Sequence, residues 1–268
     1  MSIQHDEILQ DDPVIPPITS SEVVYEGAVW DIRRETFDLP EAAGLVRDLM
    51  AHTGAVGIAV VDDQQRILLA QQYRHPVRAR LWEVPAGLLD VPGEDPLDAA
   101  KRELIEEADL TADHWDVLSD SCLTPGGSSE TMRLYLARGL SSVPEADRHE
   151  RGEEEAGFRY AWVGIDEALE AVADGRITNA IAQLAIFQVD RVLRAEAAGA
   201  PVEFRPVDAP RRLVDGRPEF GRGAQVETTG SATAETIGSG AESTSSGAGS
   251  TGSGGGDAVS SQVGSGED

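Results

Sequence analysis

The segment from Ala86 to Leu110, AGLLDVPGEDPLDAAKRELIEEADL, constrains the fold of this chain more than any other stretch. Its second half predicts a helix, because Asp95 can accept a hydrogen bond from a free amide at the helix start and Pro96 suits the first helical position. Apolar residues then recur at helical spacing and form one stripe, which consists of Leu97, Ala100, Leu104 and Ala108. Such a stripe is typical of a helix that packs against a core.

Beside this stripe the same helix carries three glutamates. Glu103, Glu106 and Glu107 lie three and four positions apart, so they share a face about 100° wide. Ionised carboxylates at this spacing repel one another, and hard divalent cations take oxygen ligands of this kind. The alternative is a solvated acidic face, which is the usual role of a run of charges.

The residues around these glutamates resemble a known pattern. Gly87, Glu94 and the run from Arg102 to Leu110 are similar to the Nudix box, G-x5-E-x7-R-E-U-x-E-E-x-G-U, where U is a large aliphatic residue. Two positions depart from it: six residues instead of five separate Gly87 from Glu94, and Asp109 replaces a glycine. Neither departure touches a carboxylate, and Asp tolerates the left-handed backbone better than most residues. The complete pattern therefore favours a cation site over a solvated face.

Composition restricts the partners. The net charge is −26 and Lys101 is the only lysine, which argues against binding nucleic acid through a basic surface. Cys122 is the only cysteine, which excludes an intramolecular disulfide and a thiolate zinc cluster. No apolar run reaches about 18 residues and the N-terminus is acidic, unlike a signal peptide. We therefore expect a cytoplasmic protein without membrane association.

The chain divides into five parts by composition. Residues 1–20 are polar and contain prolines, which predicts a flexible N-terminus, and residues 21–54 hold strand-like patches that predict a small antiparallel element. Residues 55–200 form the main domain, and residues 201–222 form a Pro- and Arg-rich linker. Residues 223–268 contain no lysine or arginine and are rich in Gly, Ser, Thr and Ala, so we expect them to be disordered and dispensable for chemistry.

Strand and helix signals alternate within the main domain. Apolar runs predict strands at 56–61, 66–73, 115–118, 132–137 and 158–163. Amphipathic patterns predict helices at 166–174 and 177–198 in addition to the box helix. Strands interspersed with helices predict an α/β fold with a mixed sheet and helices on both faces. The Nudix resemblance likewise implies an α/β/α sandwich, with the N-terminal strand element added to it.

The resemblance also implies the reaction and its cofactor. Family members hydrolyse a nucleoside diphosphate linked to another moiety and use a divalent cation, Mg²⁺ or alternatively Mn²⁺. Such a cation neutralises the pyrophosphate and lowers the pKa of a bound water. By resemblance, Glu103 and Glu107 are the principal ligands, Glu106 shares a second or third ion, and the backbone carbonyl of Ala86 is a further ligand.

Catalytic roles beyond the ligands follow from the same resemblance. Arg102 would orient the carboxylates, so it is grouped with Glu106 among the catalytic residues. A general base must take a proton from the attacking water, and in ADP-ribose hydrolases of this family a loop glutamate serves as that base. The Glu-rich loop before the strand at 158–163 offers Glu154 as the first choice and Glu155 as the second. The alternative for each is a solvated loop residue.

Three further segments resemble the ADP-ribose pyrophosphatase branch of the family. They are QQYRHP at 71–76, LWEVPAG at 81–87 and TPGGSSE at 124–130. Pro125 lies fifteen positions beyond Leu110, and a proline at this place marks the branch. Members of the branch are homodimers that pair through their N-terminal strands, so the resemblance implies a homodimer.

The substrate-binding residues are predicted from these segments. Arg74 would bind a phosphate or the terminal ribose, and Glu83 would touch the substrate or metal-bound water. Glu130 would hold a ribose hydroxyl of substrate on its own or a partner subunit, and Trp30 would be the platform for adenine. The alternatives are a surface ion pair for Arg74, loop bracing for the two glutamates and a half-buried strand aromatic for Trp30.

Together these patterns predict a Mg²⁺-dependent hydrolase that splits ADP-ribose into AMP and ribose 5-phosphate. One alternative is a hydrolase of another nucleoside diphosphate sugar or derivative. Another is a Nudix-like module that senses ADP-ribose without cleaving it. Such modules usually lose box carboxylates, whereas this chain keeps Glu103, Glu106 and Glu107.

Overall fold

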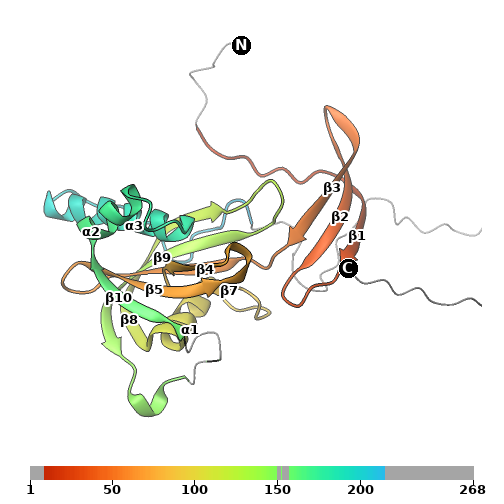
Figure 1. The fold of residues 1–268 in the computed structure, drawn as a ribbon. Helices are drawn as coiled ribbons and strands as arrows, with labels where there is room; N and C mark the ends of the chain where they lie inside the picture. The colour runs from red at the N-terminus through yellow and green to blue at the C-terminus, as the bar shows by residue number, and fades with distance from the viewer. Residues whose placement is uncertain (1–8, 150–151, 153–156, 215–268) are drawn as a thin grey trace, which may run out of the picture. The chain divides into compact units, whose positions relative to one another are not determined.

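The N-terminal part of the described chain is a three-stranded antiparallel sheet. The computed structural model describes residues 9–149, 152 and 157–214 (Figure 1). The sheet has the order β1-β2-β3, with β1 at Ile18–Tyr25, β2 at Asp31–Leu39 and β3 at Ala42–Ala51. This confirms the predicted antiparallel element, which begins three residues earlier than expected, at Ile18 instead of Ser21.

The main domain contains two further sheets. The first has the order β7-β4-β9-β8, and its strands are β4 (Ala55–Val60), β7 (Ala86–Leu88), β8 (Leu110–Cys122) and β9 (Thr131–Ser142). Strands β4 and β9 run parallel and the other pairs antiparallel, so the predicted mixed sheet is confirmed. The second is antiparallel in the order β10-β5-β6, with strands β5 (Arg66–Arg74), β6 (Ala79–Glu83) and β10 (Arg159–Gly164).

Three α-helices and two short 3-10 helices complete the described part. They are α1 (Pro96–Ala108), α2 (Ile165–Ala173), α3 (Ala180–Ala197), η1 (His75–Val77) and η2 (Glu145–Asp147). None of these helices combines the length and apolar character that a membrane span requires.

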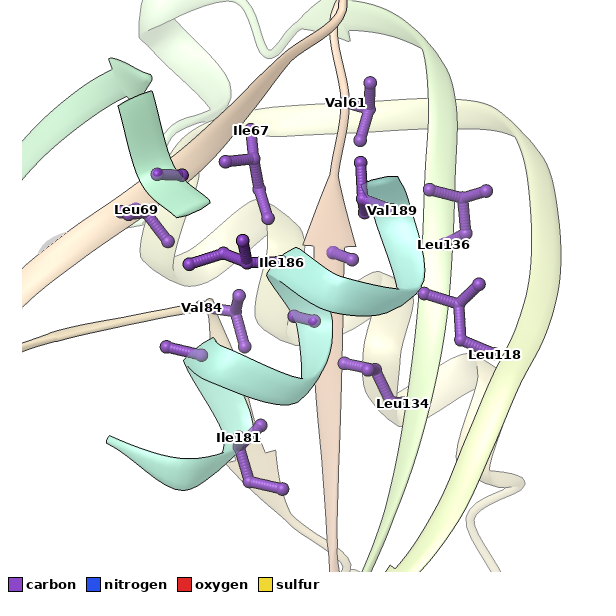
Figure 2. Close-up of a cluster of buried hydrophobic side chains, with 14 of the residues drawn as sticks. Val61, Ile67, Leu69, Val84, Leu118, Leu134, Leu136, Ile181, Ile186 and Val189 are labelled. Atoms are coloured by element: carbon purple, nitrogen blue, oxygen red, sulfur yellow. The ribbon is translucent and has the colours of Figure 1, made fainter. Parts of the chain in front are cut away.

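Strand β4 explains why helices cover both faces of the four-stranded sheet. All six of its residues are buried, and its side chains alternate between the faces. Val56, Ile58 and Val60 pack in one core cluster with Ala99, Ala100 and Leu104 of α1. Ala59 belongs to the opposite cluster, where Ile181, Ile186 and Val189 of α3 cover the sheet (Figure 2). The predicted α/β/α sandwich is therefore confirmed.

Two segments carry more structure than the sequence patterns predicted. The strand predicted at 115–118 is the middle of β8, whose polar residues on either side still pair with β9 over most of its length. After α3, Phe204 packs against the core and Arg205 forms an isolated β-bridge with Val117. The chain thus continues to contact the main domain at the beginning of the predicted linker. Residues 215–268, which include the rest of that linker and the predicted disordered tail, lie outside the described part.

Candidate active site

The helix that carries the box residues begins and ends as its sequence requires. The Asp95 carboxylate accepts a hydrogen bond from the amide of Leu97 at 2.8 Å, and Pro96 occupies the first turn. At the other end Asp109 adopts the left-handed conformation, with φ of 53° and ψ of 36°. Asp109 therefore terminates the helix with the backbone geometry for which glycine is usually preferred.

Gly87 allows strand β7 to pass close to the helix. A Cβ atom built on this glycine would overlap the carboxylate of Glu103. Any other residue would force this carboxylate or the strand to move. The glycine of the box therefore serves close packing, since Gly87 is not among the glycines with positive φ.

Arg102 connects three carboxylates of the box. Its Nε and Nη2 atoms donate to the two oxygens of Glu94, each at 3.0 Å. Its Nη1 atom donates to Glu103 Oε1 at 2.6 Å and to Glu106 Oε2 at 3.2 Å. The guanidinium lowers the pKa of Glu94, and the carboxylates around it raise the pKa of Arg102. This arrangement is the one expected of a residue that orients the carboxylates.

The other box carboxylate is held by the strand. Glu107 is buried, and its Oε2 atom accepts a hydrogen bond from the amide of Ala86 at 3.0 Å. The Tyr160 hydroxyl donates to the backbone carbonyl of Glu107, which ties the end of α1 to β10. At Glu103, burial raises the pKa more than the neighbouring Arg102 lowers it. The pKa of Glu103 therefore lies above its ordinary value.

The donor chemistry of this site fits a divalent cation. The carboxylates of Glu103, Glu106 and Glu107 are hard oxygen ligands, which Mg²⁺ and Mn²⁺ prefer. As the side chains stand, Arg102 engages Glu103 and Glu106, and the amide of Ala86 engages Glu107. Within the described residues no three acidic, His or Cys side chains already form a metal-binding group. A cation at this site would accordingly replace some of these contacts.

Arg74 and Glu83, both predicted to bind substrate, are bonded to each other. Arg74 Nε and Nη2 donate to the two oxygens of Glu83 at 3.1 and 2.8 Å, and Gln72 adds a bond of 3.3 Å. The Glu83 side chain is only 7% exposed, whereas that of Arg74 is 47% exposed. This geometry agrees with the alternative of an ion pair that braces β5 against β6. Their contacts with substrate remain predictions.

Trp30 and Glu130 come together around a residue that the sequence patterns did not single out. The ring of His52 lies 5.9 Å from that of Trp30 between centroids, tilted by 30°. Its Nε2 atom lies 3.7 Å from Glu130 Oε1. A single histidine outside any motif gives no sequence signal of this kind. Its position in the sequence, between the last N-terminal strand and the first strand of the main domain, is the only feature that could have indicated a place near the site.

Glu154 and Glu155, which are predicted to act as the general base, lie outside the described residues, so their role stays a prediction.

A cavity of about 640 Å³ is present, lined by residues that include Leu9, Leu89, Thr131 and Arg205. Of the described residues that line it, none is a predicted site residue. We therefore place the candidate site at the carboxylates of α1 and not in this cavity.

Comparisons with known proteins show what this chain is similar to. A model of the NUDIX domain matches residues 51–184. The ADP-ribose pyrophosphatase of Mycobacterium tuberculosis (strain ATCC 25618 / H37Rv) is 40% identical over 200 residues, which cover 75% of this chain and 95% of that protein. The methanol dehydrogenase activator of Bacillus methanolicus is 30% identical over 167 residues, or 62% of this chain and 88% of the activator.

A solved structure shares the fold. It is described as the crystal structure of ADP compounds hydrolase and superposes with a TM-score of 0.58 at 20% identity. The superposition covers 70% of this chain and 98% of that one. At this identity the likeness concerns the fold alone.

Proposed function

This chain belongs to the NUDIX family, and we propose that it hydrolyses ADP-ribose to AMP and ribose 5-phosphate with the help of a divalent cation. The assignment of ADP-ribose as substrate is supported mainly by the 40% identity to an ADP-ribose pyrophosphatase over 95% of that protein's length. The box carboxylates on α1, gathered around Arg102, support the pyrophosphohydrolase reaction. The relative at 30% identity carries another name, so the substrate needs a direct test.

We propose Mg²⁺ as the cation, with Mn²⁺ as a substitute, held by Glu103, Glu107 and Glu106 with the carbonyl of Ala86. A bound cation would neutralise pyrophosphate charge and lower the pKa of the attacking water. Arg102 keeps the carboxylates in place, because its guanidinium is held by both oxygens of Glu94.

The remaining roles concern the water and the substrate. Glu154, or else Glu155, accepts the proton of the attacking water. Trp30 stacks with the adenine base, which is supported by its exposure of 38% and by its position next to the ring of His52, a neighbour of Glu130. Glu130 holds a ribose hydroxyl, and Arg74 binds a phosphate or the terminal ribose through its exposed side chain.

We also propose that the protein is a homodimer that pairs through its N-terminal sheet. Apolar side chains at least 40% exposed on β1 and β3 support this: Val23, Val24, Tyr25 and Val46. Light scattering on a sizing column measures the mass directly. A monomer at micromolar concentration would contradict the proposal.

The test of the function is hydrolysis of a panel of nucleoside diphosphate sugars with Mg²⁺, Mn²⁺ or EDTA, followed by chromatography of the products. We expect AMP and ribose 5-phosphate from ADP-ribose, faster than products from the other compounds, and no turnover with EDTA. Preference for another compound would keep the reaction and overturn the substrate. Binding of ADP-ribose without cleavage of any compound would instead indicate a sensing module.

A further inference from the structure

The segment between β3 and β4 is fastened to the loop that precedes β9. The amide of Met50 donates to the carbonyl of Gly127 at 2.9 Å, and the amide of Ser129 donates to the carbonyl of Met50 at 3.0 Å. The amide of His52 donates to the Ser129 hydroxyl oxygen at 2.8 Å, and this hydroxyl reaches the carbonyl of His52 at 3.2 Å. The backbone of His52 is therefore fixed to the TPGGSSE segment, which ends at Glu130.

The ring of His52 has a defined protonation pattern. Its Nδ1 atom accepts a hydrogen bond from the amide of Gly54 at 3.0 Å, which leaves the proton of the neutral ring on Nε2. Burial lowers the pKa of His52, although the charge of Glu130 acts in the opposite direction. The 3.7 Å between Nε2 and Glu130 Oε1 exceeds a direct hydrogen bond but leaves the two groups as neighbours.

The Trp30 indole, which lies next to this ring, belongs to the turn before β2. A Cβ atom at Gly27 would overlap the carbonyl of Trp30, so this turn is tight. The amide of Gly27 also donates to Asp31 Oδ1 at 3.3 Å. The His52 side chain is 6% exposed, whereas Trp30 is 38% exposed. Trp30 is thus partly accessible to solvent, whereas the neighbouring imidazole is buried.

We propose that His52 is a positioning residue for the nucleotide: its ring sets the separation between the Trp30 indole and the Glu130 carboxylate, so that one AMP moiety can engage both. This rests on the proposed function, in which Trp30 stacks with the adenine base and Glu130 holds a ribose hydroxyl. His52 bonds to neither Glu103 nor Glu107 in the described structure. Its replacement should therefore weaken binding of the AMP moiety and leave the chemical step unchanged.

Fluorescence titration with AMP measures this binding without turnover. Stacking of adenine on an indole quenches its emission, and Trp30→Phe identifies the part of the signal that comes from Trp30. We expect His52→Gln and His52→Asn to raise the dissociation constant of AMP about tenfold, the scale of one lost stacking contact. His114→Gln, which replaces an exposed histidine on β8, is the matched control and should bind AMP as the wild type does.

Steady-state kinetics separates positioning from general damage. In both His52 variants we expect the KM for ADP-ribose to rise about tenfold while kcat stays within about twofold. Inhibition by ribose 5-phosphate, which lacks the base, should not change. The proposal would be overturned if a variant lost affinity equally for AMP and for ribose 5-phosphate, or if kcat fell at constant KM. Wild-type affinity for AMP in a folded variant would overturn it as well.

Failure of the proposed function is seen separately, because the wild type itself would then release no AMP from ADP-ribose. Circular dichroism and thermal unfolding show whether the buried substitutions are tolerated. If both His52 variants unfold, a cycle of Trp30→Phe, Glu130→Gln and the double variant replaces them. Calorimetric titration measures AMP binding in this cycle, because Trp30→Phe lacks the fluorescence signal. If the loss of AMP affinity in the double variant differs more than about threefold from the product of the two single losses, Trp30 and Glu130 are coupled, as the proposal requires; a loss equal to that product contradicts the proposal.

Discussion

The box helix and the junction around His52 bring candidate site residues together in opposite ways. On α1 the chain brings Glu103, Glu106 and Arg102 together within two turns of one helix. At the junction Trp30 and Glu130 come from distant parts of the sequence, and both lie near His52 only because two segments fold against each other. The first region can therefore be recognised by spacing, whereas the second requires the tertiary structure. We expect the first to control turnover and the second to control affinity.

The largest effect should come from the helix. Glu103→Gln or Glu107→Gln removes a charge that the cation needs, so turnover of ADP-ribose should fall by about three orders of magnitude, the scale of several kcal/mol of charge stabilisation. Steady-state kinetics with Mg²⁺ measures the loss. Glu167→Gln, an exposed glutamate in the first turn of α2, is the matched control. Full turnover in either box variant would remove that glutamate from the site.

At the junction the effect should be smaller and of a different kind. Trp30→Ala removes the proposed base platform, so the KM for ADP-ribose should rise about tenfold while kcat changes little. Phe187→Ala, which truncates an aromatic side chain that is 52% exposed on α3, should leave both constants unchanged. If Trp30→Ala lowered only kcat, the junction would control turnover as the helix does, and the proposed difference between the two regions would be wrong.

The helix end offers a test of stability instead of activity. Asp109→Ala places a residue without a polar side chain in the left-handed conformation and should lower the free energy of unfolding by about 1 kcal/mol. Asp109→Gly removes the backbone strain at this positive φ and should therefore lower the free energy of unfolding by less than the alanine variant does. Urea denaturation compares the two. Equal losses would mean that the side chain of Asp109, and not its backbone conformation, determines stability here.

The smallest effect should follow from shortening the chain. Deletion of residues 223–268 removes a segment whose composition cannot support a core, so both kcat and KM should stay within about twofold of the full chain. The same assay on ADP-ribose measures this. A large change in kcat would mean that the tail influences turnover, which we assign to the box helix. A change in KM alone would mean that it influences affinity, which we assign to the junction.

Sequence reasoning succeeded where the determining contacts are local. The start of α1 at Asp95, its carboxylate face and the α/β/α arrangement follow from helical and strand periodicity, and the structure confirms them. The predicted strand inside β8 was too short, because polar residues such as His114 and Ser121 still pair with β9. The pairing of backbone groups between strands is insensitive to side-chain polarity, so hydropathy alone understates such a strand.

Spacing along the chain by itself determined the family box, the chemistry of its donors and the helix that presents them, since residues three and four apart must share a helix face. Only the tertiary structure decided that Arg74 bonds Glu83 across β5 and β6, and that Gly87 leaves room for Glu103. It also placed His52 next to both Trp30 and Glu130. These contacts depend on strand register and on the close approach of distant segments, which no local pattern of residues encodes.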